Sequence, residues 1–344
     1  MVTFQGSGEQ RKRLHNAKAT FLLAGSLTRT YEIEGITQAG IPGKIHLTPT
    51  LDAEFVDSGR LFSLDNIAET PKGVPTPAII TRAVRRLTDF AFEVLDLGLD
   101  VEPKVEVLHR SGLMPSGNIL EGAGIDAKSV IERGISFGEK YEHSRDILLL
   151  GESTPAGTTT AYATAKALGV DADGCFSSSF KNAPANLKKS VVDQALLRVE
   201  DADLYARLGA VSDNMLLFCA GFASAFSQKA PVVLGGGTQM AAVLLLIDKL
   251  GLEVNRDNIS LMTTGWVYRD ANSDIAGLLK QLSQPVEASY ADFSFAKTQI
   301  PVLKLYDEGE AKEGVGAGVA LCLALENGFG EEEIVREVEK VLTA

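Results

Sequence analysis

The sequence is poor in the residues that would crosslink a fold or hold a metal. Its 344 residues include three cysteines and four histidines. Cys175, Cys219 and Cys322 lie far apart without a CxxC spacing, and no histidines follow an HxxxH pattern. These absences argue against a disulfide framework and against a structural zinc site. We therefore expect reduced thiols in the core and no bound metal.

Positive charge and long apolar runs are also scarce. The formal net charge is −12, and the basic residues Arg11, Lys12, Arg13 and Lys18 are few and close to the N-terminus. This balance disfavours general binding to nucleic acid or to anionic membranes. The longest apolar run, residues 241–247, is far shorter than the ~20 residues of a membrane span, and the first residues lack the apolar core of a signal peptide. We expect a soluble, cytoplasmic protein with small-molecule substrates.

One local pattern occurs three times: a short apolar run, a turn of Gly, Thr or acidic residues, and a small-residue helix. The copies are ILLLGESTPAGTTTAYATAKALG (147–169), PVVLGGGTQMAAVLLLID (231–248) and VLKLYDEGEAKEGVGAGVALCLALENG (302–328). Each predicts a buried parallel strand, a loop and a helix packed on the sheet. Because each loop leads into a helix N-terminus, it presents backbone N–H groups and the positive end of the helix dipole. The three loops predict a site for one phosphate-bearing ligand.

Strand-like and helical segments alternate along the rest of the chain. We expect strands at 19–27, 101–109, 258–266 and 300–307, and a strand or an edge segment at 44–55. We expect helices at 75–98, 126–144, 187–199, 215–228 and 331–344. This alternation predicts an α/β fold with a doubly wound, mostly parallel, Rossmann-like sheet and a smaller helical domain built from flanking segments. We expect the large domain over 19–310, with 62–98 adding helices to the small domain, and the C-terminal helices of the small domain over 311–344. Ligands of such sheets bind at the carboxyl ends of the strands.

The Gly-rich loops do not match two common phosphate-binding motifs. GESTPAGTTT (151–160) has five residues between its glycines and lacks the Lys of a Walker A loop. No GxGxxG opens a first strand–helix unit with an acidic residue about twenty positions later, so dinucleotide binding is unsupported. Taken singly, GGGTQM (235–240) could be a tight turn, but three loops in one sheet favour a shared site.

These loops resemble those of the nicotinate-nucleotide:dimethylbenzimidazole phosphoribosyltransferases, which make the lower-ligand nucleotide of cobamides. GESTPAGTTTA is similar to that family's GEMGIGNTT loop. The segments GVPTPAIIT (73–81), LKKSVVDQAL (187–196), PVVLGGGTQMAA (231–242) and PVLKLYDEGEAKEGVGAG (301–318) resemble its GVSxYPxxVT, HKxxVIxxAL, PVVxDGFxxxAA and PLLDLxLRLGEGTGA. The resemblance is collinear over about residues 73–320. Thr158 in place of the family's Asn, and Gly235 or Gly236 in place of its Asp, indicate a divergent, archaeal- or cyanobacterial-type branch.

The resemblance implies transfer of 5-phosphoribosyl from nicotinate mononucleotide to a benzimidazole-like base, giving an α-riboside phosphate. It implies no cofactor, with nicotinate mononucleotide as substrate, and a homodimer. Because the donor already carries a pyridinium, nicotinate leaves without an acid or a metal. As one imidazole nitrogen attacks C1′, the proton on the other nitrogen needs a base within hydrogen-bond reach.

Glu313, which matches the Glu of GEGTGA, is the candidate base. The nearby acids Asp307, Glu308 and Glu310 leave open a solvated acidic loop, and a Glu before a helix can also serve as a cap. Like-charged neighbours would raise the pKa of Glu313. Glu152 matches a second acidic position of the family. It could bind ribose hydroxyls, serve as a second base or accept hydrogen bonds from backbone N–H groups of its own loop.

The resemblance assigns the remaining residues to substrate binding. Lys188 would neutralise the donor phosphate, with Lys181 and Lys189 as alternatives. Thr76 stands where relatives have an aromatic residue, so the base pocket between 73–81 and Glu313 would accept a purine or a phenol-like ring. The other expected ligand-binding residues are Gly151, Gly157, Thr158, Thr159, Thr160, Gly235, Gly236, Gly237, Thr263, Thr264, Gly314 and Gly316. A noncatalytic nucleotide or phosphosugar sensor, and a glycosyltransferase with another acceptor, stay open.

Overall fold

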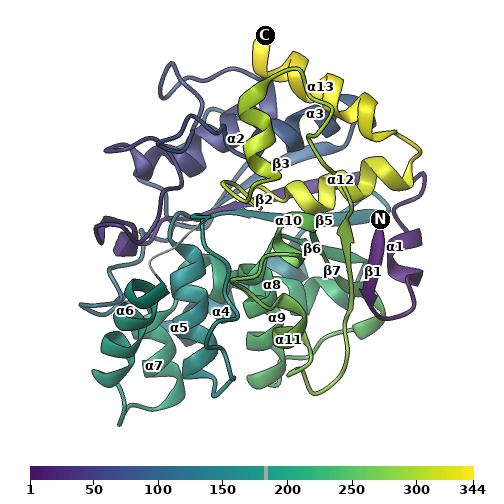
Figure 1. Ribbon diagram of the computed structural model, residues 1–344. Coiled ribbons are helices and arrows are strands. Elements are labelled where there is room, and N and C mark those ends of the chain that lie inside the picture. The colour runs from purple at the N-terminus through teal and green to yellow at the C-terminus, as the bar shows by residue number, and fades with distance from the viewer. Residues whose placement is uncertain (182–184) are drawn as a thin grey trace.

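A single eight-stranded sheet forms the centre of the computed structural model, which describes residues 1–181 and 185–344 (Figure 1). The strand order is β1-β8-β7-β6-β5-β2-β3-β4. The strands are β1 (Val2–Gln5), β2 (Ala19–Gly25), β3 (Ala91–Asp96), β4 (Leu108–Arg110), β5 (Ile147–Ser153), β6 (Val232–Gly235), β7 (Ile259–Thr264) and β8 (Glu287–Ala291). Neighbours pair in parallel, except that β1 runs antiparallel to β8. The expected mostly parallel α/β sheet is confirmed.

The direction of strand addition reverses at β2. From β2 the chain adds β3 and β4 on one side, then returns to β5 on the other side and continues through β6, β7 and β8. Gly25 at the end of β2 pairs with Ser153 at the end of β5. In open parallel sheets, ligands bind outside the carboxyl ends of the strands at such a reversal. The topology therefore predicts a site at the ends of β2 and β5.

Helices cover both faces of the sheet, which confirms the doubly wound arrangement (Figure 1). One core includes α4 (Ala127–Lys140), α5 (Gly157–Ala167), α8 (Asn214–Ser227), α9 (Thr238–Lys249) and α11 (Ile275–Leu279), with α6 (Ala185–Leu197) and α7 (Leu204–Val211) packed on α5. The other core includes α2 (Thr48–Ser58), α3 (Ala78–Thr88), α12 (Ala317–Glu326) and α13 (Glu331–Thr343). Successive residues of β2 alternate between the two cores: Leu22 and Ala24 face one, Phe21 and Leu23 the other.

Short elements complete the chain. They are α1 (Glu9–Lys12), α10 (Gly265–Tyr268) and the 3₁₀ helices η1 (Arg29–Glu32), η2 (Ile45–Leu47), η3 (Arg256–Asn258) and η4 (Pro301–Tyr306). Every helix in the described ranges is too short or too polar to cross a bilayer. Helices α12 and α13 pack against α3, and the expected division of the chain at residue 310 stays a prediction.

Two predictions in the N-terminal third of the chain are wrong. The segment 44–55 is not a strand but η2 followed by α2, because Pro49 lies in the first turn of the helix and Leu51 and Phe55 are buried at helical spacing. The expected helix over 75–98 ends at Thr88, where Asp89 adopts a left-handed conformation with φ 52°. β3 then begins at Ala91.

Two other expected strands also differ. Of the segment 101–109, only its last two residues belong to a strand, β4. The segment 300–307 forms η4, because Pro301 opens it and Leu303 and Tyr306 are buried three residues apart, which is the 3₁₀ period. The third copy of the strand–loop–helix pattern therefore keeps its loop and its helix, α12, but has no strand.

Candidate active site

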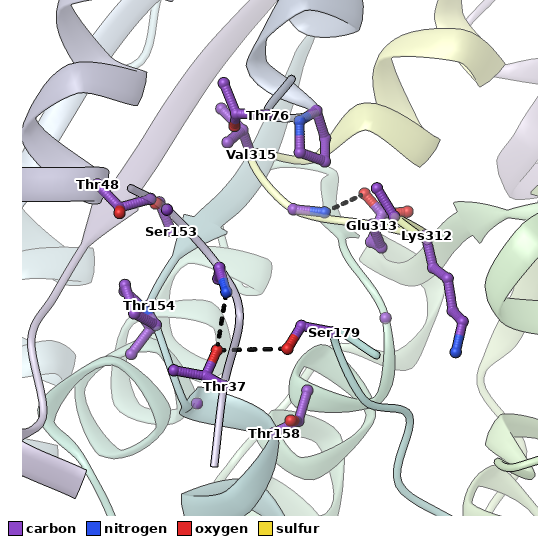
Figure 2. A pocket seen from close by; sticks show the side chains of 18 of the residues that line it. Thr37, Thr48, Thr76, Ser153, Thr154, Thr158, Ser179, Lys312, Glu313 and Val315 are labelled. Carbon is purple, nitrogen blue, oxygen red and sulfur yellow. Dashed lines mark hydrogen bonds between the residues drawn. The ribbon is translucent and has the colours of Figure 1, made fainter. Parts of the chain in front are cut away.

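A cavity of about 140 Å³ lies at the carboxyl ends of the central strands (Figure 2). The starts of α5 and α9 and the loop before α12 all contribute to its wall, so the three Gly-rich loops meet at one place. The predicted ligand-binding residues that line it are Thr76, Glu152, Gly157, Thr158, Gly237, Glu313 and Gly314. Helix α2, misread as a strand, adds Thr48 and Asp52.

Other predicted residues lie behind the wall and shape it. A Cβ at Gly235 would stand 2.1 Å from Val319 Cγ1, and one at Gly316 would stand 3.2 Å from the Cα of Gly151. These glycines therefore let the loop before α12 approach the ends of β5 and β6. Gly236 has a similar steric role, because a Cβ there would lie 2.7 Å from Met240 Cγ.

Three of the predicted threonines contact buried carboxylates beside the cavity: one contacts Asp213 and two contact Glu313. Thr160 Oγ1 donates to Asp213, the N-cap of α8. Thr263 and Thr264 contact Glu313. The hydroxyl of Thr159 is buried and has no partner among the described residues.

Glu313 is held by backbone donors on both carboxylate oxygens. Oε1 accepts from Gly318 N at 3.0 Å and from Gly314 N at 3.2 Å, and Oε2 accepts from Thr264 N at 3.0 Å. Burial raises the pKa of Glu313 to about 7, although these N–H groups favour the ionised form. A carboxylic acid with this pKa can exchange a proton near neutral pH.

The acids next to Glu313 in the sequence are not the cause of that pKa. Asp307 accepts from Trp266 Nε1 at 2.9 Å, while Glu308 pairs with Lys181 at 3.2 Å. Glu310 is buried and pairs with Lys72 at 2.6 Å. The expectation that like-charged neighbours raise the pKa of Glu313 is therefore wrong, because burial is the cause. The three acids are paired side chains, of which Asp307 and Glu308 are exposed and Glu310 is buried.

The loop that carries Glu313 has an unusual backbone. Gly314, Val315 and Gly316 have φ values of 146°, 55° and 62°. A β-branched residue in the left-handed region is rare and costs about 1–3 kcal/mol. Val315 is held there because its N–H donates to Glu152 O at 2.7 Å and its carbonyl accepts from Thr81 Oγ1 at 2.8 Å. The loop is thus tied to both β5 and α3.

Glu152 is a second buried acid in the wall. Burial raises its pKa to about 8, and the charges of Glu313, Asp213 and Asp52 act in the same direction. The side chain is therefore mostly protonated at pH 7 and can donate a hydrogen bond. This environment fits a ligand contact better than a second base that must be ionised.

Replacing Glu152 is expected to make the folded state less sensitive to alkaline pH. The wild-type folded state retains a proton that the unfolded state loses above its pKa of about 4.5, so stability falls as pH rises until about pH 8. Glu152→Gln removes this loss. Between about pH 5 and about pH 8, its free energy of unfolding should therefore rise relative to that of the wild type by about 2–4 kcal/mol. Urea unfolding across this range measures it. A pH-independent difference between the two proteins would contradict the assignment.

Two lysines place their ammonium groups along the segment 177–180. Lys188 Nζ donates to Thr158 Oγ1 at 2.9 Å and to Ser177 O at 2.7 Å, both neutral partners on residues that line the cavity. Lys312 Nζ pairs with Asp270 Oδ2 at 2.6 Å. Burial of the ammonium group, together with the charge of Lys312, lowers the pKa of Lys188 to about 7. Two ammonium groups facing one carboxylate favour an anionic ligand.

The structure separates Lys188 from the two alternatives considered for it. The side chains of Lys181 and Lys189 are exposed and pair with Glu308 at 3.2 Å and Asp193 at 2.6 Å. Lys312 was missed by the sequence reasoning, although it directly precedes Glu313. Its position next to a candidate base was the available signal.

Several further polar residues of the wall were also missed. Four residues that line the cavity each carry a buried polar atom that has no partner in the described part of the chain: the hydroxyls of Thr48, Thr154 and Thr238, and Oε1 of Gln239. Buried polar atoms are nearly always hydrogen-bonded in native proteins. Their concentration here indicates a ligand rich in hydroxyl or phosphate groups. Thr154, Thr238 and Gln239 stand in the Gly-rich loops, but the loop sequences do not show that these side chains lack partners, because that depends on tertiary packing.

Two segments distant in sequence meet at the cavity. Thr37 Oγ1 and Ser179 Oγ lie 3.3 Å apart (Figure 2). Gln38 N also donates to Ser179 Oγ, at 3.1 Å. Ser177 and Ser178 line the same wall. The histidines are not part of this lining, and among residues 1–181 and 185–344 no cluster of His, Cys, Asp and Glu is arranged to hold a metal.

Comparisons with known proteins agree with this architecture. A family model described as "Phosphoribosyltransferase" matches residues 79–254. A UPF0284 protein of Sulfolobus acidocaldarius is 39% identical over 329 residues and covers 95% of both chains. A UPF0284 protein of Archaeoglobus fulgidus is 40% identical over 332 residues, covering 95% of this chain and 94% of its own length.

Solved structures share the fold at low sequence identity. CobT from Thermus thermophilus matches with a TM-score of 0.61 and 18% identity, over 96% of this chain and 90% of that one. A nicotinate-nucleotide-dimethylbenzimidazole phosphoribosyltransferase from the same organism matches with a TM-score of 0.59 and 19% identity, over 94% and 83%. The chain therefore belongs to the nicotinate-nucleotide:dimethylbenzimidazole phosphoribosyltransferase family, in a branch whose archaeal relatives carry the name UPF0284.

Proposed function

We propose that the protein is a phosphoribosyltransferase that moves 5-phosphoribosyl from nicotinate mononucleotide to a benzimidazole-like base. The product is an α-riboside phosphate for the lower ligand of a cobamide. The observation that carries the proposal is the carboxylate of Glu313, whose pKa is raised by burial to about 7, at the wall of a cavity whose lining residues include several with unpartnered buried polar atoms in the described chain. Family membership supports it, and one of the solved structures that share the fold is a nicotinate-nucleotide-dimethylbenzimidazole phosphoribosyltransferase.

Each end of the cavity has a role in this reaction. The donor phosphate lies near Thr158 at the start of α5, where Lys188 and Lys312 supply positive charge. The ribose hydroxyls meet the unpartnered side chains of the wall, such as Thr154 and Gln239 among the described residues. The acceptor ring lies between the segment of Thr76 and the loop before α12.

Glu313 acts as the general base. As one ring nitrogen of the acceptor attacks C1′, the bond from C1′ to the nicotinate nitrogen breaks and its electron pair neutralises the pyridinium. The proton on the second acceptor nitrogen passes to the carboxylate of Glu313, where the long hydrogen bond from Thr263 Oγ1, at 3.4 Å, gives way to it. The backbone N–H groups of Gly314, Gly318 and Thr264 fix the orientation of that carboxylate.

Turnover of defined bases tests the proposal. The purified protein is incubated with nicotinate mononucleotide and separately with dimethylbenzimidazole, benzimidazole and adenine, and riboside phosphates are detected by mass spectrometry. We expect an α-riboside phosphate and one equivalent of nicotinate. Donor binding without release of nicotinate in any mixture would favour the noncatalytic nucleotide or phosphosugar sensor. A product on another class of acceptor would favour a glycosyltransferase with another acceptor.

The remaining expectations follow from the same assignment. We propose small-molecule substrates, no cofactor, a cytoplasmic location and a homodimer. Light scattering would measure the mass of the dimer.

A further inference from the structure

One end of the cavity holds a buried carboxylate that the proposed reaction does not use. Asp52 lies on α2, is 2% exposed and lines the cavity. Its Oδ1 accepts from Thr76 Oγ1 and its Oδ2 from Ser153 Oγ, each at 2.7 Å. These contacts place Asp52 between the end of β5 and the segment expected to hold the acceptor ring.

Asp52 retains hydrogen-bonding capacity. A carboxylate accepts about four hydrogen bonds, and here the two described side-chain donors account for one on each oxygen. Thr48 lies one helical turn before Asp52, so both side chains share a face of α2. The hydroxyl of Thr48 is buried, lines the cavity and has no partner in the described chain.

Apolar side chains complete this end of the cavity. Val74, Pro77 and Val315 line it together with Thr76. In Figure 2, Thr48, Ser153, Thr76 and Val315 occupy the upper part of the view, and Thr158, at the phosphate end, lies below. A flat ring can therefore contact apolar atoms on its faces while one edge meets the oxygens of α2.

We propose that Asp52, assisted by Thr48, selects the acceptor base. The acceptor is an azole-containing ring that carries a hydrogen-bond donor, such as an amine or a hydroxyl, on the edge away from the attacking nitrogen. This inference rests on the proposed function. A methyl group at that edge leaves the carboxylate buried without a new partner, which is costly, whereas an amine of similar size pairs with it.

Two acceptor bases of nearly the same size and shape test this selection, because they differ only in the group that would face Asp52. The values of kcat/KM are measured with nicotinate mononucleotide and either 5-aminobenzimidazole or 5-methylbenzimidazole. The wild type should prefer the amine by at least about tenfold, because sites built to hydrogen-bond a substrate group strongly reject analogues without it. Asp52→Leu should remove or reverse the preference. Asp52→Asn should reduce it, and Thr48→Val should reduce it less.

Asp57→Asn is the matched control. Asp57 lies on the same helix, pairs with Arg85 at 3.0 Å and does not line the cavity. Its variant should keep the wild-type ratio of the two bases. If Asp52→Leu does not fold, Asp52→Asn and Thr48→Val carry the comparison.

Other results would overturn the inference. A wild type without preference for the amine would do so, as would an equal loss of kcat/KM for both bases in Asp52→Asn, which would indicate a ribose contact or a structural role. If neither base is turned over, the proposed function fails instead. Calorimetric titration of the two bases then still tests Asp52, because equal affinities in wild type and Asp52→Asn would exclude it as a selector.

Discussion

Glu313→Gln is expected to lower kcat by about 10²- to 10⁴-fold, the usual contribution of a positioned general base. The variant keeps the size of the side chain but cannot accept the acceptor's proton. The Glu313 carboxylate accepts from the backbone N–H groups of Gly314, Gly318 and Thr264, whereas the Lys312 ammonium group pairs with Asp270. The dissociation constant of nicotinate mononucleotide should therefore change little. Single-turnover release of nicotinate and calorimetry of donor binding measure the two quantities.

The pH dependence of kcat tests the role of Glu313 as a base independently of the substitution. Burial raises the pKa of Glu313 to about 7, so kcat should fall about tenfold per unit below that pH as the carboxylate becomes protonated. Glu308→Gln is the control, because Glu308 is exposed and pairs with Lys181. Its kcat should match the wild type. A Glu313→Gln enzyme that retains more than about a tenth of wild-type kcat would exclude Glu313 as the base.

Lys188→Met is expected to raise the KM for nicotinate mononucleotide by roughly 30- to 100-fold, with a smaller change in kcat. A unit charge about 6 Å from another contributes about 2–3 kcal/mol at an effective dielectric constant of about 20. The variant leaves Lys312 paired with Asp270 and removes the excess positive charge beside Thr158. Steady-state kinetics with varied donor concentration measures this change.

The pH dependence of donor binding distinguishes Lys188 from a structural lysine. Its pKa is lowered to about 7, so the wild type loses the ammonium charge as pH rises above 7, and donor affinity should weaken over that range. Lys188→Met should lose this part of the dependence, while ionisation of Glu313 and Glu152, with pKa values of about 7 and about 8, acts alike in both proteins. Lys189→Met is the control, since Lys189 is exposed and pairs with Asp193 at 2.6 Å. An unchanged KM in Lys188→Met would contradict a role in phosphate binding.

The sequence predicts the sheet well where local patterns are unambiguous. The buried runs of β2, β5 and β7 and the Asp126 cap of α4 follow from burial and capping alone. Convergence of the first two Gly-rich loops follows from parallel topology, because the carboxyl ends of parallel strands lie at one edge. The loop of Glu313 reaches the same edge without a strand of its own, which no local pattern indicates.

The site is harder to predict because its parts depend on tertiary contacts. Asp52 was missed because the segment 44–55 was expected to be a strand. It belongs instead to α2, which has Pro49 in its first turn and brings Asp52 to the cavity wall. Likewise, the raised pKa of Glu313 depends on the depth at which it is buried, which a run of acidic letters does not indicate. The distinction between Lys188 and Lys189 depends on which face of α6 meets α5.

The three successive residues of positive φ around Val315 have a consequence for how the enzyme would work. The chain alone would seldom adopt this turn, so the surrounding fold supplies the free energy that maintains it. The reactive carboxylate is then aligned before any substrate arrives, and little conformational entropy remains to be lost at the moment of encounter. Loosening this turn would slow the chemical step while leaving capture of the nucleotide almost intact.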